Sequence, residues 1–391
     1  MRMSDLIDCL GSVLPSPDGA GEFSKAHDGR GLAQRRQARA LFAPLCRAAC
    51  SASPMFATLI EAALLSTMNA RPADAHVKWF CAFDVAAQPR TLENVLCLDF
   101  ELLLSLAAFS VLMACLAEPT ALGHAATRAF DHVTMPLRLR TEEMIRAICG
   151  FFFISIGILG GFLLTPELKT TAPQVAVLQF AIAAGMLWRQ TLPLSAAGIV
   201  VLFGIAVSNY GVFHLMDYPI FLGLAAYLAL VGLQKNSLFG VSPIDVLRYA
   251  TALTLMWASV EKWAYPQWSF PILIEHSIIT LGFDSEFYMR AAGMVEFTLA
   301  FALLWTPLIR RCSAAILVVA FIAACFEFGK IDAVGHSAII AALFAIACDG
   351  KAYARDRRVP WLAPIALCAS LAATLLVYYL DHALSFDTAL L

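Results

Sequence analysis

The chain has 391 residues, of which 60% are hydrophobic and only 14% are charged, and its mean hydropathy is +0.74. About a quarter of the residues of a soluble domain are charged, so this composition excludes an ordinary soluble protein and predicts an integral membrane protein. The formal net charge of −2 provides no basic face for nucleic acid. We therefore expect the lipid bilayer, and no nucleic acid, among the partners.

The N-terminal part of the chain differs from the rest. Residues 1–51 are mostly polar with a basic cluster, and no apolar run of signal-peptide length occurs before residue 40. We expect this segment to be a disordered basic tail in the cytoplasm. Apolar runs of about 20 residues, long enough to cross a bilayer as helices, then follow near 52–70, 99–118, 145–165, 173–189, 193–213, 217–234, 244–263, 287–306, 311–328, 333–348 and 361–380.

These runs predict an all-α fold, a polytopic transmembrane bundle of about eleven helices. With the N-terminus cytoplasmic and the C-terminus outside, 20 of the Lys and Arg residues lie on the inner side and 7 on the outer side. Cytoplasmic loops carry this excess, and we expect a bacterial inner membrane. The predicted regions are the tail 1–51, a six-helix region 52–243 with an outer loop 71–98, and a region 244–391.

The outer loop and the helix ends carry tryptophans and cysteines. Trp257, Trp263 and Trp268 flank the outer end of the 244–263 run, where indole rings typically form a belt at the headgroups. Cys81 and Cys97 lie in the outer loop, so a disulfide between them is permitted in a periplasm; two separate thiols are the alternative. No pair has C-x-x-C spacing, and we interpret the cysteines inside the apolar runs as small apolar residues.

Ionisable side chains within the expected helices gather toward the outer ends, where each needs a partner or a water-filled cavity. The segment 327–336 reads Glu-Phe-Gly-Lys-Ile-Asp-Ala-Val-Gly-His. Asp332 and His336 are four residues apart, so on a helix they share a face. The carboxylate can then orient the imidazole as a proton acceptor or a metal ligand. The alternative is a charged helix cap whose residues simply pair.

A second set of charges lies on the neighbouring helices. Lys262 is expected to pair with Glu296 or Glu327, whereas the adjacent Glu261 points elsewhere, and Glu327 and Lys330 are spaced to neutralise one another. Such pairs either specify helix packing or hold an anionic group and carry protons. The candidate catalytic residues are His336, Glu296 and Asp332, and the candidate substrate-binding residues are Lys262, Glu261, Glu327 and Lys330.

A metal site is a further hypothesis. His214, Asp217 and His276 could offer two imidazoles and a carboxylate to iron, copper or zinc, although histidines on separate loops are more often exposed polar residues. The chain has no phosphate-binding glycine loop, Gly-x-Ser-x-Gly elbow or His-Glu-x-x-His pattern. A nucleotide hydrolase and a serine or zinc protease with these motifs are therefore excluded.

Residues 244–348 resemble the DoxX-like membrane family, four-helix proteins associated with quinone-linked sulfur oxidation and redox stress. The similarity lies in Trp257–Trp263 with its Glu-Lys pair, in the Gly-x-x-Glu of Gly293–Glu296, and in the segment 327–336; the preceding helices would be an N-terminal extension. The resemblance implies a quinone-linked redox component at the periplasmic face, beside a redox partner protein. Quinone is then the expected cofactor, with His336 and Glu296 exchanging protons and Lys262 holding a carbonyl or anionic group.

Two other functions fit the sequence. A proton-coupled transporter of a small solute would use Glu296 and His336 as its relay, but it needs a path to the inner side, where few ionisable residues lie. A non-catalytic scaffold or assembly factor would bind a periplasmic partner through the outer loop. Trp79, Phe80 and Phe83 would be its apolar anchors.

Overall fold

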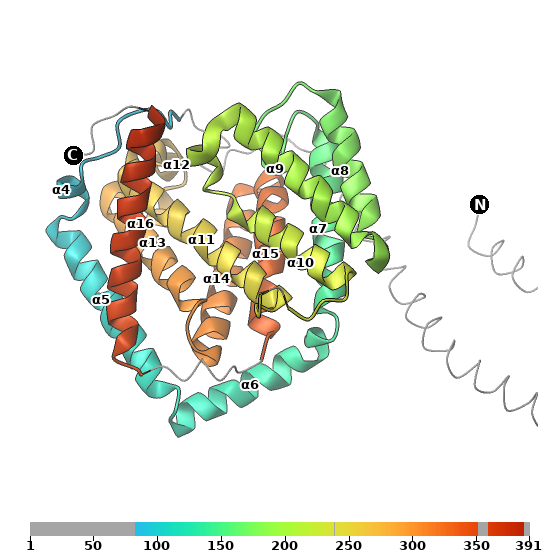
Figure 1. Ribbon diagram of the computed structural model, residues 1–391. Coiled ribbons are helices and arrows are strands. Elements are labelled where there is room, and N and C mark those ends of the chain that lie inside the picture. Colours follow the sequence, from blue (N-terminus) through green and yellow to red (C-terminus); the bar gives the residue numbers. More distant parts are fainter. Residues whose placement is uncertain (1–82, 238, 351–358, 387–391) are drawn as a thin grey trace, which may run out of the picture. The chain divides into compact units, whose positions relative to one another are not determined.

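The computed structural model describes residues 83–237, 239–350 and 359–386 (Figure 1). The described residues form α-helices and no β-strand, so the all-α fold is confirmed. All of them belong to one unit, which spans residues 59–391. The predicted tail 1–51 and the predicted helix 52–70 lie outside the described residues.

The long helices follow the apolar runs, and several begin at a proline, whose fixed φ and missing N–H suit the first helical turn. Three helices, α4, α6 and α12, lie between the predicted runs. The elements are α4 (Leu92–Val95), α5 (Leu98–Ala117), α6 (Ala121–Arg138), α7 (Thr141–Leu159), α8 (Pro173–Gly185), α9 (Leu192–Leu215), α10 (Pro219–Gly232), α11 (Pro243–Ala264), α12 (Phe270–Glu275), α13 (Ser285–Ala302), α14 (Pro307–Phe328), α15 (Lys330–Cys348) and α16 (Leu362–Phe386).

Five helical segments of the described chain are long and apolar enough to cross a membrane. They are the helices α5, α14, α15 and α16, and the segment 189–215, which contains α9. The helices α8 and α10 are apolar but shorter. The chain is therefore a membrane protein. The count of eleven spans stays a prediction, because α7, α11 and α13 each carry three or more charged side chains.

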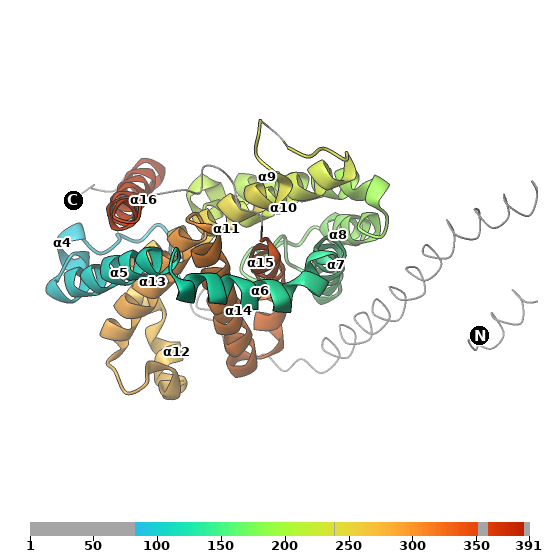
Figure 2. The same cartoon turned by 90° about the horizontal axis from the view of Figure 1, so that it is seen from below.

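Four helices form a closed unit within the bundle. The helix α11 packs on α13 and α15, and α14 also packs on α13 and α15. The helices α14 and α15 lie side by side in both views (Figure 1, Figure 2). The segment that resembles the DoxX-like family, 244–348, therefore contributes four mutually packed helices. The remaining helices flank this unit: α7 packs on α15, α10 on α11, and α5 on α13.

Polar contacts gather at the end of the bundle that carries the α14–α15 turn, which we call the hairpin end. Gly329 makes this turn with a φ of +87°, a conformation that glycine adopts without steric cost. An ion pair of 3.3 Å joins Arg290 Nη1 at the start of α13 to Asp99 Oδ2 at the start of α5. His276 Nδ1 lies 2.9 Å from Glu327 Oε1 at the end of α14. The first link joins the start of α13 to the start of α5, and the second joins the end of α12 to the end of α14.

Residues 83–91 cross the hairpin end as a strap. The Arg90 amide donates to the Ala264 carbonyl over 2.9 Å at the end of α11. The Tyr265 hydroxyl donates to the Ala87 carbonyl over 2.7 Å, and the Tyr379 hydroxyl donates to the Arg90 carbonyl over 2.5 Å. The described half of the predicted outer loop is thus fastened to α11 and α16.

Phe83 lies at the start of this strap and points inward. Its ring makes edge contacts with His214 and Trp268, at centroid distances of 5.7 Å and 5.9 Å. It is therefore not an outward anchor, contrary to the sequence-based expectation. The other two proposed anchors, Trp79 and Phe80, lie outside the described residues.

The three tryptophans near the end of α11 are buried, so the predicted headgroup belt is wrong. Trp257 packs against Phe213 of α9, and the Trp268 ring stacks on its neighbour Tyr265 at 4.1 Å. The Trp263 indole N–H donates to a backbone carbonyl of α13 over 3.2 Å. Side chains that were expected to meet lipid headgroups instead join helices to one another.

The opposite end of the bundle carries α6, and we call it the α6 end. Figure 1 shows α6 crossing below α14 and α15, on which it packs. Arg310 and Arg311, expected as loop charges, are buried in α14; Arg311 pairs with Asp131 of α6 at 3.0 Å. Hydrogen bonds from Arg138 and Arg311 hold the pKa of Asp131 below its usual range. Arg138 and Arg311 therefore fasten α6 to the membrane helices.

Candidate functional site

The hairpin of α14 and α15 brings together the side chains that are best suited to catalysis or ligand binding. Asp332 and His336 lie on the first two turns of α15, and Asp332 Oδ2 is 2.9 Å from His336 Nδ1. Asp332 is 1% exposed, whereas the His336 side chain is 12% exposed. The predicted pairing on one helix face is confirmed. The buried carboxylate fixes the ring orientation and the tautomer of His336.

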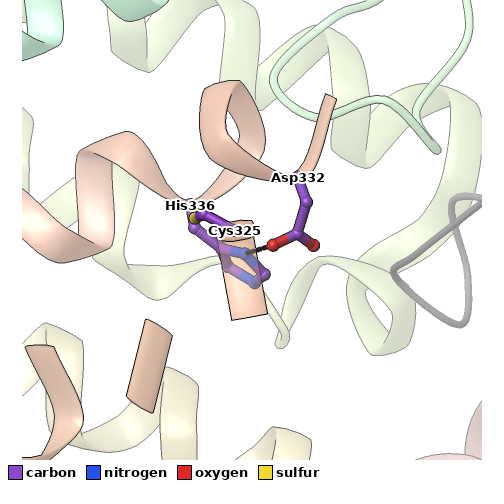
Figure 3. A group of neighbouring side chains, drawn as sticks. All are labelled: Cys325, Asp332 and His336. Atoms are coloured by element: carbon purple, nitrogen blue, oxygen red, sulfur yellow. Dashed lines mark hydrogen bonds and ion pairs between the residues drawn. The ribbon is translucent and has the colours of Figure 1, made fainter. Parts of the chain in front are cut away.

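Cys325 of α14 completes this group. Its thiol lies beside the Asp332–His336 pair, and the ligating atoms of Cys325, Asp332 and His336 all lie within 4.8 Å of one another (Figure 3). The sequence analysis treated this cysteine as a small apolar residue and missed it. The signal was its position: Cys325 lies four residues before Gly329 and Asp332 lies three after it, so the turn brings the two helix faces together.

The surroundings of the group are apolar. The Phe321 ring packs against the His336 imidazole, with a centroid distance of 4.8 Å. Polar interactions are stronger in such a low-dielectric setting than in water, so each hydrogen bond within the group carries more weight.

Lys262 and Glu296 form a second polar pair, between the packed helices α11 and α13. Lys262 Nζ of α11 lies 2.9 Å from Glu296 Oε2 of α13, which confirms one of the two expected partners. The side chains are 28% and 20% exposed. The adjacent Glu261 points about 100° away from Lys262 around α11.

Gly293 explains how α11 and α13 come so close. A Cβ atom at this position would lie 2.5 Å from Trp263 Nε1 and 3.1 Å from the Ser259 carbonyl oxygen. Only glycine leaves room for the indole ring between the helices. The Gly-x-x-Glu pattern therefore combines a packing position, Gly293, with a polar position, Glu296, one turn further along α13.

The Glu327 and Lys330 side chains do not pair with one another, so that prediction is wrong. Glu327 pairs with His276 and not with the nearby lysine, because the segment that follows α12 brings the imidazole to the end of α14. Both Glu327 and Lys330 are exposed. This arrangement leaves Glu327 and Lys330 as surface groups of the hairpin end.

The predicted metal trio of His214, Asp217 and His276 is not brought together. His214 Nε2 lies 2.6 Å from Glu167 Oε1, and both side chains are buried; His276 is engaged at the end of α14 instead. Within residues 83–237, 239–350 and 359–386, the group formed by Cys325, Asp332 and His336 is the one with three ligating atoms in close reach. Sequence reasoning also missed Glu167, since it lies in the connection between α7 and α8.

The proposed disulfide involves a residue that cannot be placed. Cys97 lies directly before α5, half-buried, with a free thiol. Cys81 lies outside the described residues. The pairing of Cys81 with Cys97 therefore stays a prediction.

Comparison with known proteins adds no relative to this geometry. No family model matches the chain, and no curated protein and no solved structure matches it significantly. The resemblance to the DoxX-like family therefore rests on the residues themselves and stays a prediction.

Proposed function

We propose that the protein is a quinone-linked redox component of a bacterial inner membrane. The observation that carries the proposal is the ion pair of 2.9 Å between Lys262 and Glu296, on two packed helices of a strongly apolar chain. Ionisable groups among membrane helices are costly and commonly functional. The DoxX-like features of 244–348 support the same function, because Lys262 and Glu296 belong to the segments that carry the resemblance.

The proposed topology has eleven spans, a cytoplasmic N-terminus and a periplasmic hairpin end. Segments expected on the cytoplasmic side, including 119–146 and Arg311, meet at the α6 end, whereas those expected outside, including Arg290 and Lys330, meet at the hairpin end. The helix α6 exposes Leu122 and Val133 beside its polar contacts. Helices of this kind lie in the headgroup layer, and this supports a position of α6 on the cytoplasmic leaflet in the proposed topology.

The residues present suit a quinone. A bound quinone supplies reversible two-electron, two-proton chemistry, and its carbonyl oxygens accept hydrogen bonds. The Lys262 ammonium group is a donor for a carbonyl oxygen, and Glu296 is a carboxyl group that exchanges a proton beside it. Because both side chains are partly exposed, a ligand can reach them. The oriented imidazole of His336 adds a second polar group within the same four-helix unit.

The test is quinone binding by the purified full-length protein in lipid nanodiscs. Wild type should retain quinone through purification and bind added quinone, and Glu296→Gln or Lys262→Met should reduce both by at least about tenfold, since each removes one charge-assisted contact. His132→Ala, on the exposed surface of α6, is the matched control and should leave both unchanged. Wild type that neither retains nor binds quinone would refute the proposal.

The two alternative functions have weaker support. A proton-coupled transporter needs polar groups that continue to the α6 end, but there Arg311 and Arg310 are held by Asp131 and Asp349. A scaffold that binds a periplasmic partner loses Phe83 as an outward anchor, because that ring packs inward.

A further inference from the structure

Three side chains of different ligand chemistry converge at the α14–α15 turn (Figure 3). Cys325 supplies a thiol from the last turn of α14, and Asp332 and His336 supply a carboxylate and an imidazole from the start of α15. Their ligating atoms lie within 4.8 Å of one another. A hydrogen bond of 2.9 Å joins the imidazole of His336 to the carboxylate of Asp332.

This spacing is close to the one that a tetrahedral ion requires. With metal–ligand bonds of about 2.0 to 2.3 Å, the ligand atoms of a tetrahedral site lie about 3.3 to 3.8 Å apart. A pair of ligand atoms at the upper limit of 4.8 Å would need to approach by about 1.0–1.5 Å. The Asp332–His336 pair, at 2.9 Å, would need to open by a few tenths of an ångström. Side-chain rotation provides movements of this size. Because Gly329 fixes the turn between the two helices, the backbone already holds the three residues in register.

We infer that Cys325, Asp332 and His336 bind one divalent transition-metal ion of the zinc and cobalt class. A thiolate and an imidazole select borderline-soft ions over magnesium and calcium, which prefer oxygen ligands. Three protein ligands leave a fourth position for water or a substrate, the pattern of catalytic and not of structural zinc sites. On loading, the thiol releases its proton to solvent, and the imidazole keeps its proton on the nitrogen that faces away from the ion. The hydrogen bond between the carboxylate and the imidazole is then replaced by bonds from both groups to the ion.

This inference goes beyond the proposed quinone function and does not depend on it. The quinone proposal is carried by Lys262 and Glu296, on α11 and α13, whereas the metal ligands lie on α14 and α15. His336 is named in both proposals, but neither Cys325 nor Asp332 is a quinone contact. A metal-binding experiment without quinone therefore succeeds or fails independently of the redox proposal.

The experiment uses the full-length protein in detergent, stripped with a chelator and titrated with Co²⁺ and then Zn²⁺. Wild type should bind one ion per chain and show a thiolate-to-cobalt charge-transfer band that Zn²⁺ removes. Cys325→Ser should abolish the band, and Asp332→Asn or His336→Gln should weaken binding by at least about tenfold. Cys312→Ser is the matched control and should retain the band, because Cys312 is a half-buried cysteine near the start of the same helix.

A second measurement on wild type guards against variants that fail to fold. Maleimide labelling of Cys325, followed by mass spectrometry, should be slowed by Zn²⁺, whereas labelling of Cys368 on α16 should not change. The inference is overturned if wild type shows no thiolate band, if Cys325→Ser keeps it, or if Zn²⁺ leaves Cys325 labelling unaffected.

Discussion

The contact between Gly293 and Trp263 provides a sharp test of how α11 and α13 pack. In Gly293→Ala, the new methyl carbon would lie 2.5 Å from Trp263 Nε1 and 2.9 Å from Cε2, and 3.1 Å from the Ser259 carbonyl oxygen. Because the indole is buried and rigid, it cannot turn aside cheaply. The ring or the whole of α13 must shift, which also strains the hydrogen bond from Trp263 to Arg290.

The magnitude follows from three contributions. Overpacking of a buried position costs about 1–3 kcal/mol, and loss of the indole hydrogen bond costs about 0.5–1.5 kcal/mol. Replacing glycine by alanine within a helix returns up to about 1 kcal/mol. We therefore expect Gly293→Ala to destabilise the protein by roughly 0.5–4.5 kcal/mol, with a central value of about 2–3 kcal/mol. Gly204→Ala on α9 is the matched control, because its Cβ meets no atom within 4 Å, and it should be neutral or slightly stabilising.

The assay is unfolding of the purified protein in mixed micelles by increasing fractions of SDS, followed by circular dichroism and tryptophan fluorescence. Adding Trp263→Phe to Gly293→Ala should cost less than the sum of the two single changes, because the smaller ring relieves the clash. Equal unfolding midpoints for Gly293→Ala and Gly204→Ala would refute this account of the helix contact.

Three further predictions concern contacts at the two ends of the bundle. Asp131→Asn should destabilise the protein, because buried Arg311 loses a partner. Folding lowers the pKa of Asp131, so the carboxylate stabilises the folded state only where it is ionised. The difference in unfolding midpoint between wild type and variant should therefore be present above about pH 4 and vanish as the pH falls below that value. His276→Ala removes a partly exposed pair and should change stability by less than about 1 kcal/mol in the same assay. Tyr379→Phe should release the strap at Arg90, costing about 0.5–1.5 kcal/mol, and should speed hydrogen exchange of residues 83–91; unchanged exchange would contradict the strap's attachment.

The helical content could be predicted from the sequence because lipid requires backbone hydrogen bonds to be satisfied within each segment. Apolar runs therefore mark the helices directly, as α14 and α15 show. The same patterns could not reveal α6, whose amphipathic character resembles that of a loop with scattered charges. Nor could they show that Arg310 and Arg311 are buried, since two arginines beside an apolar run also fit a cytoplasmic loop.

The candidate site was predictable where its residues lie on one helix, or on two long helices that follow one another in the chain. Asp332 and His336 share a face at spacing four, and Lys262 and Glu296 belong to consecutive long helices. Cys325 was missed because its relation to Asp332 depends on a turn geometry that spacing alone does not specify. Contacts between distant segments, such as the pairing of His214 with Glu167, depend on tertiary packing and leave no local pattern.

The most direct test of the proposed function is photolabelling of the purified protein in nanodiscs with a photoreactive quinone, followed by mapping of the labelled peptides. The account predicts labelling within α11 and α13, suppressed by excess unlabelled quinone and strongly reduced in the charge-neutral double variant Lys262→Met with Glu296→Gln. Labelling confined to other helices, or labelling that the double variant leaves unchanged, would contradict it.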